Sequence, residues 1–297
     1  MQQKTKAHLA LLFTNIFFAI NYTAVKSLIN NGLVKPFGLN LLRVGISAIL
    51  LWSLYFFKPV KSTIHKKDLG RFFLCALTGI AINQLLFIKG LSLTYSIHAS
   101  LLMLTTPILI TFFAAWVLKE RLSNYKIAGL AMGIAGAVVL ITARDNSGTG
   151  ADVLYGDLLI ILNAISYTIY FVLVRPLMKE YNPITVIRMI FTIGFFMILP
   201  FCWNEFMDVP WHAYDTTSFL LLASIVFGGT FLAYIFNVYG IKVLGASMAG
   251  TYIYSQPVFA AAIAIVFLGE ELSFYKIIAA VFIFAGVYLA NKTSNNA

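Results

Sequence analysis

The sequence predicts an all-α integral membrane protein of ten transmembrane helices, arranged as two inverted five-helix repeats. The composition, the recurrence of long apolar runs and an internal sequence repeat predict this fold. Of the 297 residues, 60% are hydrophobic and 11% are charged, whereas roughly a quarter of the residues in ordinary soluble domains are charged. Such a chain cannot cover itself with polar surface, so we expect lipid to be its main solvent.

Apolar runs long enough to cross a bilayer recur along nearly the whole chain. A hydrocarbon core about 30 Å thick needs about 20 apolar residues per helix. The runs predict helices at 7–28, 36–57, 70–90, 96–118, 124–143, 154–174, 183–202, 217–240, 247–268 and 274–291. The first run is longer than the apolar part of a signal peptide and includes Asn15 and Asn21, so we expect an uncleaved helix.

Lys and Arg side chains gather at the amino end and in alternate connections. The connections at 58–71, 119–126 and 175–179 are basic, whereas 91–95 and 203–216 contain neither residue type. The positive-inside rule therefore predicts that both termini are cytoplasmic. A net charge of +10 would suggest nucleic acid in a soluble protein, but basic clusters beside a membrane bind anionic lipid. We expect membrane lipids as partners and no nucleic acid.

An internal repeat divides the chain. A shift of 150 residues lays GLSLTYSIHASLLMLTTP (90–107) on GIKVLGASMAGTYIYSQP (240–257) without a gap. The predicted units are a first five-helix repeat at 1–143, a second at 154–291 and a cytoplasmic tail at 292–297. Because five is odd, the second repeat must enter the membrane from the opposite side. Inverted repeats are typical of carriers whose two bundles move about a central site, so transport is the expected function.

The same segments carry a resemblance to a known family. Pro107 is followed thirteen residues later by Glu120, Pro257 is followed at the same spacing by Glu270, and the first helix contains FAINYTAVK. In these features the chain resembles the EamA-type members of the drug/metabolite transporter superfamily. The resemblance implies a ten-helix carrier of the inner (plasma) membrane, with a central cavity lined by helices 1, 3, 4, 6, 8 and 9.

Polar side chains share single faces of several predicted helices. Polar groups in lipid normally face the bundle interior or a wet cavity, and helical spacing places Asn163, Tyr167 and Tyr170 on one face. The predicted substrate-binding residues are Thr14, Asn21, Asn83, Gln84, His98, Thr105, Asn163, Tyr167, Tyr170, Tyr234, Asn237, Tyr252 and Ser255. For each of them the alternative is a hydrogen bond that only holds two helices together.

Several charged residues also fall inside or beside the helices. Arg43 and Arg188 follow a proline at similar distances, and either anchor their helices at the interface by snorkelling or act as gates. Lys26 is expected at the interface. Glu270 is expected to cap a helix or to pair with a nearby lysine.

Catalytic and metal-binding patterns are missing from the predicted membrane interior. We expect no Asp or Glu there, and the predicted spans contain no Gly-x-Ser-x-Gly motif and no pair of His. Cys75 and Cys202 lie far apart in apolar segments, so neither a disulfide nor a metal site is expected. We expect no cofactor and no enzymatic activity.

The expected function is a secondary carrier that exports small metabolites. A pocket of amides, hydroxyls and aromatic rings without a carboxylate favours neutral or zwitterionic solutes such as amino acids. The alternative is a multidrug exporter of amphipathic compounds, and an intramembrane enzyme or a receptor is disfavoured. The protein is expected to be a monomer or a homodimer.

Overall fold

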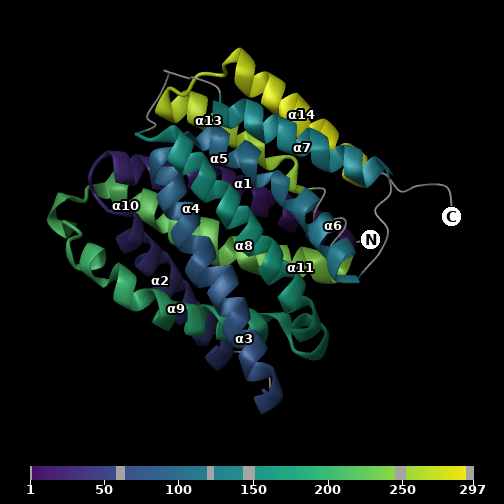
Figure 1. The fold of residues 1–297 in the computed structure, drawn as a ribbon. Coiled ribbons are helices and arrows are strands. Elements are labelled where there is room, and N and C mark those ends of the chain that lie inside the picture. Colours follow the sequence, from purple (N-terminus) through teal and green to yellow (C-terminus); the bar gives the residue numbers. More distant parts are fainter. Residues whose placement is uncertain (1, 58–63, 119–123, 143–150, 245–251, 292–297) are drawn as a thin grey trace.

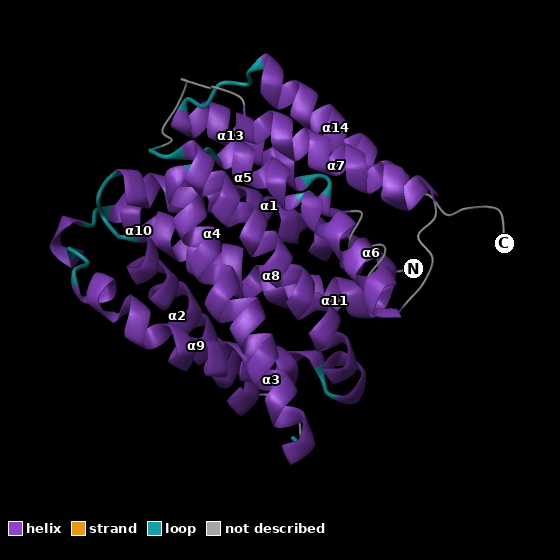
Figure 2. Cartoon of the chain, in the orientation of Figure 1, coloured by secondary structure: helices purple, strands orange, loops and turns teal. Residues whose placement is uncertain are grey.

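The computed structural model describes residues 2–57, 64–118, 124–142, 151–244 and 252–291. These residues form helices joined by short loops, and no strand occurs among them (Figure 2). Seven helices are long and apolar enough to cross a membrane, and three shorter apolar helices lie at Ser96–Ile110, Gln256–Leu268 and Phe274–Leu289. Together they fall on the ten predicted spans, so the protein is an all-α membrane protein.

Several spans consist of more than one helical segment. The first half contains α1 (Gln2–Asn30), α2 (Pro36–Phe57), η1 (Lys66–Asp68), α3 (Leu69–Ala76), η2 (Leu77–Ala81), α4 (Ile82–Leu93), α5 (Ser96–Met103), α6 (Thr105–Leu118) and α7 (Asn124–Thr142). The second half contains α8 (Val153–Glu180), α9 (Pro183–Met207), η3 (Trp211–Ala213), α10 (Thr216–Ala223), η4 (Ser224–Leu232), α11 (Ala233–Leu244), α13 (Gln256–Leu268) and α14 (Phe274–Asn291).

Local sequence explains where several helices begin and end. Asp152, Asn182 and Asp215 precede α8, α9 and α10, and each side chain accepts a backbone N–H of the first turn. Such caps satisfy amides that have no partner inside the helix. Gly32 and Gly269, with φ of 69° and 64°, lie just beyond α1 and α13, where glycine adopts the left-handed conformation without a Cβ penalty.

Two π-helical segments interrupt corresponding spans of the two halves. The segment η2 covers Leu77–Ala81 and η4 covers Ser224–Leu232. A shift of 150 residues carries η2 into the middle of η4. Segments of this kind are rare and occur frequently near functional sites, and their recurrence extends the internal repeat from sequence to backbone geometry.

Corresponding helices of the two halves pack in pairs (Figure 1). Helix α2 lies along α9, and α7 lies along α14 at the edge of the molecule. The first helix of each half crosses to the other half. Helix α1 packs on η4, α11 and α13, whereas α8 packs on η2, α4, α5 and α6. The centre of the protein is therefore enclosed by elements of both halves.

Small residues permit the close contact of α7 with α14. A Cβ atom built on Gly286 would lie 2.7 Å from the Gly129 carbonyl oxygen and 2.7 Å from the Gly133 amide nitrogen. Gly129 and Gly133 form a GxxxG pair, the spacing at which membrane helices pack closely.

Replacing Gly286 by alanine should weaken this helix pair. The added Cβ would overlap backbone that cannot rotate away, and overpacking of this kind typically costs about 1–3 kcal/mol. We expect Gly286→Ala to lower the thermal unfolding midpoint of the purified protein in detergent. Gly70→Ala is the control, because a Cβ at Gly70 meets no atom within 4 Å. Equal midpoints for the two variants would contradict the proposed packing.

Candidate functional site

A central cavity of about 140 Å³ lies between the two halves. Helices α1, α2, α4, α5, α6, α8, α11 and α13 contribute to its wall. The lining residues are Thr14, Asn15, Phe18, Asn21, Tyr22, Arg43, Asn83, Gln84, Phe87, Met103, Thr106, Asn163, Tyr167, Tyr234, Asn237, Ile253 and Gln256. The wall includes all six spans that the family resemblance implied, and α2 in addition.

Eight of the thirteen predicted binding residues line this cavity. They are Thr14, Asn21, Asn83, Gln84, Asn163, Tyr167, Tyr234 and Asn237. Some of them also join helices. The Asn83 amide donates to the Asn163 carbonyl oxygen at 3.3 Å, and the Asn163 amide donates to the Asn83 carbonyl oxygen at 2.7 Å. Gln84 donates to the Tyr234 hydroxyl at 3.2 Å.

The other five predicted residues lie outside the cavity wall. Thr105 and Ser255 donate to backbone carbonyl oxygens of their own segments, at 2.7 Å each. Tyr252 shares a hydrogen bond of 2.8 Å with His8 of α1. Tyr170 contacts Gly79 one turn beyond Tyr167, and His98 pairs with Asp157 at 2.9 Å. Their side chains are engaged with neighbouring helices or backbone.

Nine lining residues were not among the predicted binding residues. They are Asn15, Phe18, Tyr22, Arg43, Phe87, Met103, Thr106, Ile253 and Gln256. Gln256 donates to the Tyr22 hydroxyl at 3.1 Å. Asn15, Tyr22, Thr106 and Gln256 each directly follow a predicted binding residue, so their place in the sequence could have indicated them. Arg43 has no such neighbour. The apolar members carry no signal that separates them from ordinary core.

Snorkelling to the interface is wrong for both arginines. Arg43 is 3% exposed and lines the cavity. Arg188 is 6% exposed, and its guanidinium carbon lies 4.6 Å and 3.9 Å from the ring centres of Trp52 and Tyr55. The two buried arginines thus have different surroundings, one polar and one aromatic.

A model of the EamA-like transporter family matches residues 5–142 and again residues 154–292. The chain belongs to this family. Because both matches together cover nearly the whole chain, the two halves of this EamA-like transporter are two copies of the family unit.

Relatives of this EamA-like transporter span similar lengths. A protein of Archaeoglobus fulgidus named as an uncharacterized transporter is 25% identical over 96% of this chain and 97% of its own length. A probable terminal-alkyne amino-acid exporter of Streptantibioticus cattleyicolor is 25% identical over 97% and 94%. A crystal structure with a TM-score of 0.64 and 20% identity covers 97% of this chain and 98% of that one, which supports the fold.

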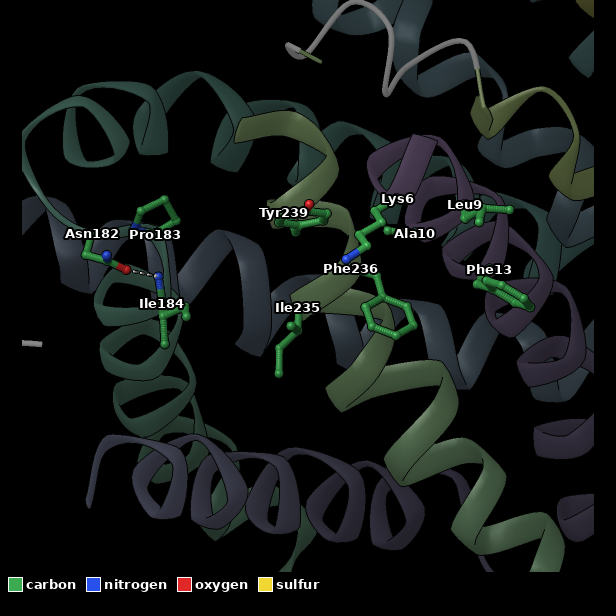
Figure 3. Close-up of a pocket in the computed structure, with 10 residues that line it drawn as sticks. All are labelled: Lys6, Leu9, Ala10, Phe13, Asn182, Pro183, Ile184, Ile235, Phe236 and Tyr239. Carbon is green, nitrogen blue, oxygen red and sulfur yellow. Dashed lines mark hydrogen bonds between the residues drawn. The ribbon is translucent and has the colours of Figure 1, made fainter. Parts of the chain in front are cut away.

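A second hollow of about 540 Å³ lies where α1 begins, between α1, α11 and the start of α9 (Figure 3). Its wall is mostly apolar, with Phe13, Ile184 and Phe236 among the lining residues. The Asn182 oxygen is already occupied, because it accepts the Ile184 amide at 3.0 Å. The hollow offers few groups for recognising a polar solute, so the central cavity is the candidate site of this EamA-like transporter.

A buried charged cluster lies at the end of the bundle opposite the start of α1. It consists of Lys26, His98, Asp157, Glu270 and Lys276, each at most 1% exposed. Lys26, expected at the interface, is buried inside the protein, and the expected absence of acidic residues from the predicted membrane interior is wrong. Asp157 lies within the predicted span 154–174, one turn inside α8.

The cluster ties segments of both halves together. Lys26 donates to the carbonyl oxygen of Thr94, whose hydroxyl donates to Asp157. The ammonium groups of Lys26 and Lys276 lie 5.9 Å and 4.7 Å from the centre of the Tyr95 ring, where cation–π attraction stabilises them.

Glu270 caps a helix of the other half. Its carboxylate accepts the Ser96 amide at 2.7 Å and the Ile97 amide at 3.0 Å, which lie in the first turn of α5. The expectation of a capping role is confirmed in kind, although the capped helix is distant in sequence.

Glu270→Ala should destabilise the protein. It leaves two buried amides without an acceptor and removes a buried negative charge, changes that typically cost about 3–5 kcal/mol together. Glu271→Ala is the matched control, since that neighbour is exposed. We expect the thermal unfolding midpoint in detergent to fall for Glu270→Ala alone. Equal midpoints would show that the carboxylate contributes nothing to stability.

Proposed function

We propose that this transporter is an alternating-access carrier that exports small neutral or zwitterionic metabolites, with amino acids the favoured class. The observation that carries the proposal is the central cavity, whose wall combines side chains of both halves. Relative motion of the halves would change every side of such a site at once, as alternating access requires.

The size of the cavity favours metabolites over drugs. Sites for drug-sized ligands typically have volumes of about 300–1,000 Å³, whereas this cavity measures about 140 Å³. Its polar lining also exceeds the few polar groups typical of such sites. The similarity to the probable terminal-alkyne amino-acid exporter of Streptantibioticus cattleyicolor supports the same class of solute.

The eight cavity residues that the sequence predicted are proposed to contact the solute. Tyr167→Ala and Asn237→Ala should weaken solute binding by about five- to a hundredfold, because a lost hydrogen bond to a buried group typically costs about 1–3 kcal/mol. The measurement is counterflow of radiolabelled amino acids into liposomes containing the purified variant.

Leu162→Ala is the control for these variants, since Leu162 lies on the exposed face of the same helix as Tyr167 and is 50% exposed. Normal counterflow by both cavity variants across the amino-acid panel would place the site elsewhere. Failure of both to accumulate in the membrane would show that their polar groups only join helices.

We also propose an inner-membrane location with both termini in the cytoplasm, as the basic connections favour. Single cysteines replacing Lys66 and His212, both exposed, test this in a protein lacking Cys75 and Cys202. A membrane-impermeant thiol reagent should label the cysteine at 212 in intact cells and the cysteine at 66 only after the membrane is opened. Labelling of both in intact cells would refute the topology.

A further inference from the structure

The wall of the cavity contains the buried guanidinium group of Arg43, whose positive charge no described acidic side chain balances. The Arg43 Nε donates to the Thr230 hydroxyl oxygen at 3.3 Å. Its Nη1 is buried without a hydrogen-bond partner. No ion pair joins Arg43 to an acidic side chain in the described ranges, and none of the described lining residues is acidic.

A guanidinium group in this position has a strong requirement for an anion. Arginine remains protonated in proteins, and a buried charge without a partner is costly because it has lost its hydration. Arg188, the buried arginine of α9, shows how this fold accommodates such a charge elsewhere. Although its Nε also lacks a partner, its guanidinium stacks on Trp52 and Tyr55.

The same cavity offers acceptors for a positive group. The amide oxygens of Asn15, Asn21, Gln84 and Asn163 are buried without a hydrogen-bond partner, and all four side chains line the cavity. Three of these residues are at most 3% exposed. Unsatisfied buried polar atoms are uncommon in folded proteins, and four acceptors around one space suit a donor such as an ammonium group.

We propose that Arg43 binds the carboxylate of the transported solute, while the amide oxygens of Asn15, Asn21, Gln84 and Asn163 receive its ammonium group. The proposal rests on the carrier function proposed above and narrows its substrate class to α-amino acids. A single guanidinium balances a single negative charge and fits a carboxylate bidentately. A phosphate monoester, with about −1.5 to −2 charges, would be left undercompensated.

The remaining wall suits the side chain of such a solute. Phe18, Phe87, Met103 and Ile253 supply apolar surface, and Tyr22 and Phe87 meet edge to face with ring centres 5.5 Å apart. An amino acid whose carboxylate and ammonium groups are both bound by the polar part of the wall would place an apolar side chain against these residues. L-leucine and L-phenylalanine are therefore the probes.

Two variants that each replace one arginine by glutamine provide the test. Binding of L-leucine and L-phenylalanine to the purified full-length protein is measured by titration, beside leucinamide and phenylalaninamide, which lack the carboxylate, and 3-phenylpropionate, which lacks the ammonium group. We expect Arg43→Gln to weaken amino-acid binding by about 10- to 100-fold, as for a charge-assisted hydrogen bond. Arg188→Gln should bind as the wild type does, and the wild type should discriminate against all three analogues.

The unfolding midpoint without ligand is a second readout, because it distinguishes an arginine that binds the solute from one that only stabilises the fold. Arg43→Gln removes an uncompensated buried charge, so the unfolding midpoint should remain equal or rise. Arg188→Gln removes stacking on two rings, so its midpoint should fall. A falling midpoint together with unchanged amino-acid binding in Arg43→Gln would show that Arg43 is structural and would overturn the proposal.

Counterflow in liposomes separates this proposal from the carrier function. Movement of glucose or uridine but not of amino acids would overturn the role of Arg43 and leave a carrier. Equal binding of phenylalanine and phenylalaninamide would likewise overturn it. If the wild type moves no solute of the panel, both proposals fail together.

Discussion

The exchange of first helices between the halves is the contact on which the interior depends. At Gly229 of η4, an added Cβ would lie 2.7 Å from the Asn21 side-chain oxygen of α1, and at Gly79 of η2 it would lie 2.5 Å from the Tyr170 ring of α8. Both glycines belong to π-helical segments and correspond under the internal repeat. Because these two positions have no side chain, α1 and α8 can reach the centre of the protein. The cavity is the space that remains between these two helices.

Hydrogen bonds between helices and recognition of a solute use the same residues here. Asn83 and Asn163 bind each other's backbone with their nitrogen atoms, and the Asn163 oxygen remains without a partner. One amide can thus hold two halves together through its nitrogen while its oxygen keeps no hydrogen-bond partner. In lipid, water does not compete for these groups. The double use of the same side chains for helix contacts and for solute recognition explains why a small bundle retains so many polar residues.

Helical spacing predicted the fold and most of the polar face, but it could not show how far along each helix the cavity extends. Asn163, Tyr167 and Tyr170 do share a face of α8, yet the last of them lies beyond the cavity because the stripe is longer than the space it borders. For Arg43 the sequence left both interfacial anchoring and gating open, since sequence does not show which neighbours leave room for a guanidinium. Asp157 lies one turn inside α8 and within the predicted span 154–174, so the sequence alone was enough to show an acidic residue in this span. Its partner, His98, comes from a distant segment.

The charged cluster constrains how the end of the bundle opposite the start of α1 could open. The cluster joins several helices: Lys26 belongs to α1, Asp157 to α8, Glu270 to the junction of α13 with α14, and Lys276 to α14. Moving these helices apart would separate opposite charges. In a dry medium the attraction between such charges is many times stronger than in water, so a gap without water would be prohibitively unfavourable. Hydration would have to accompany separation, and this end would therefore open as a water-filled vestibule whose stability responds to ionic strength.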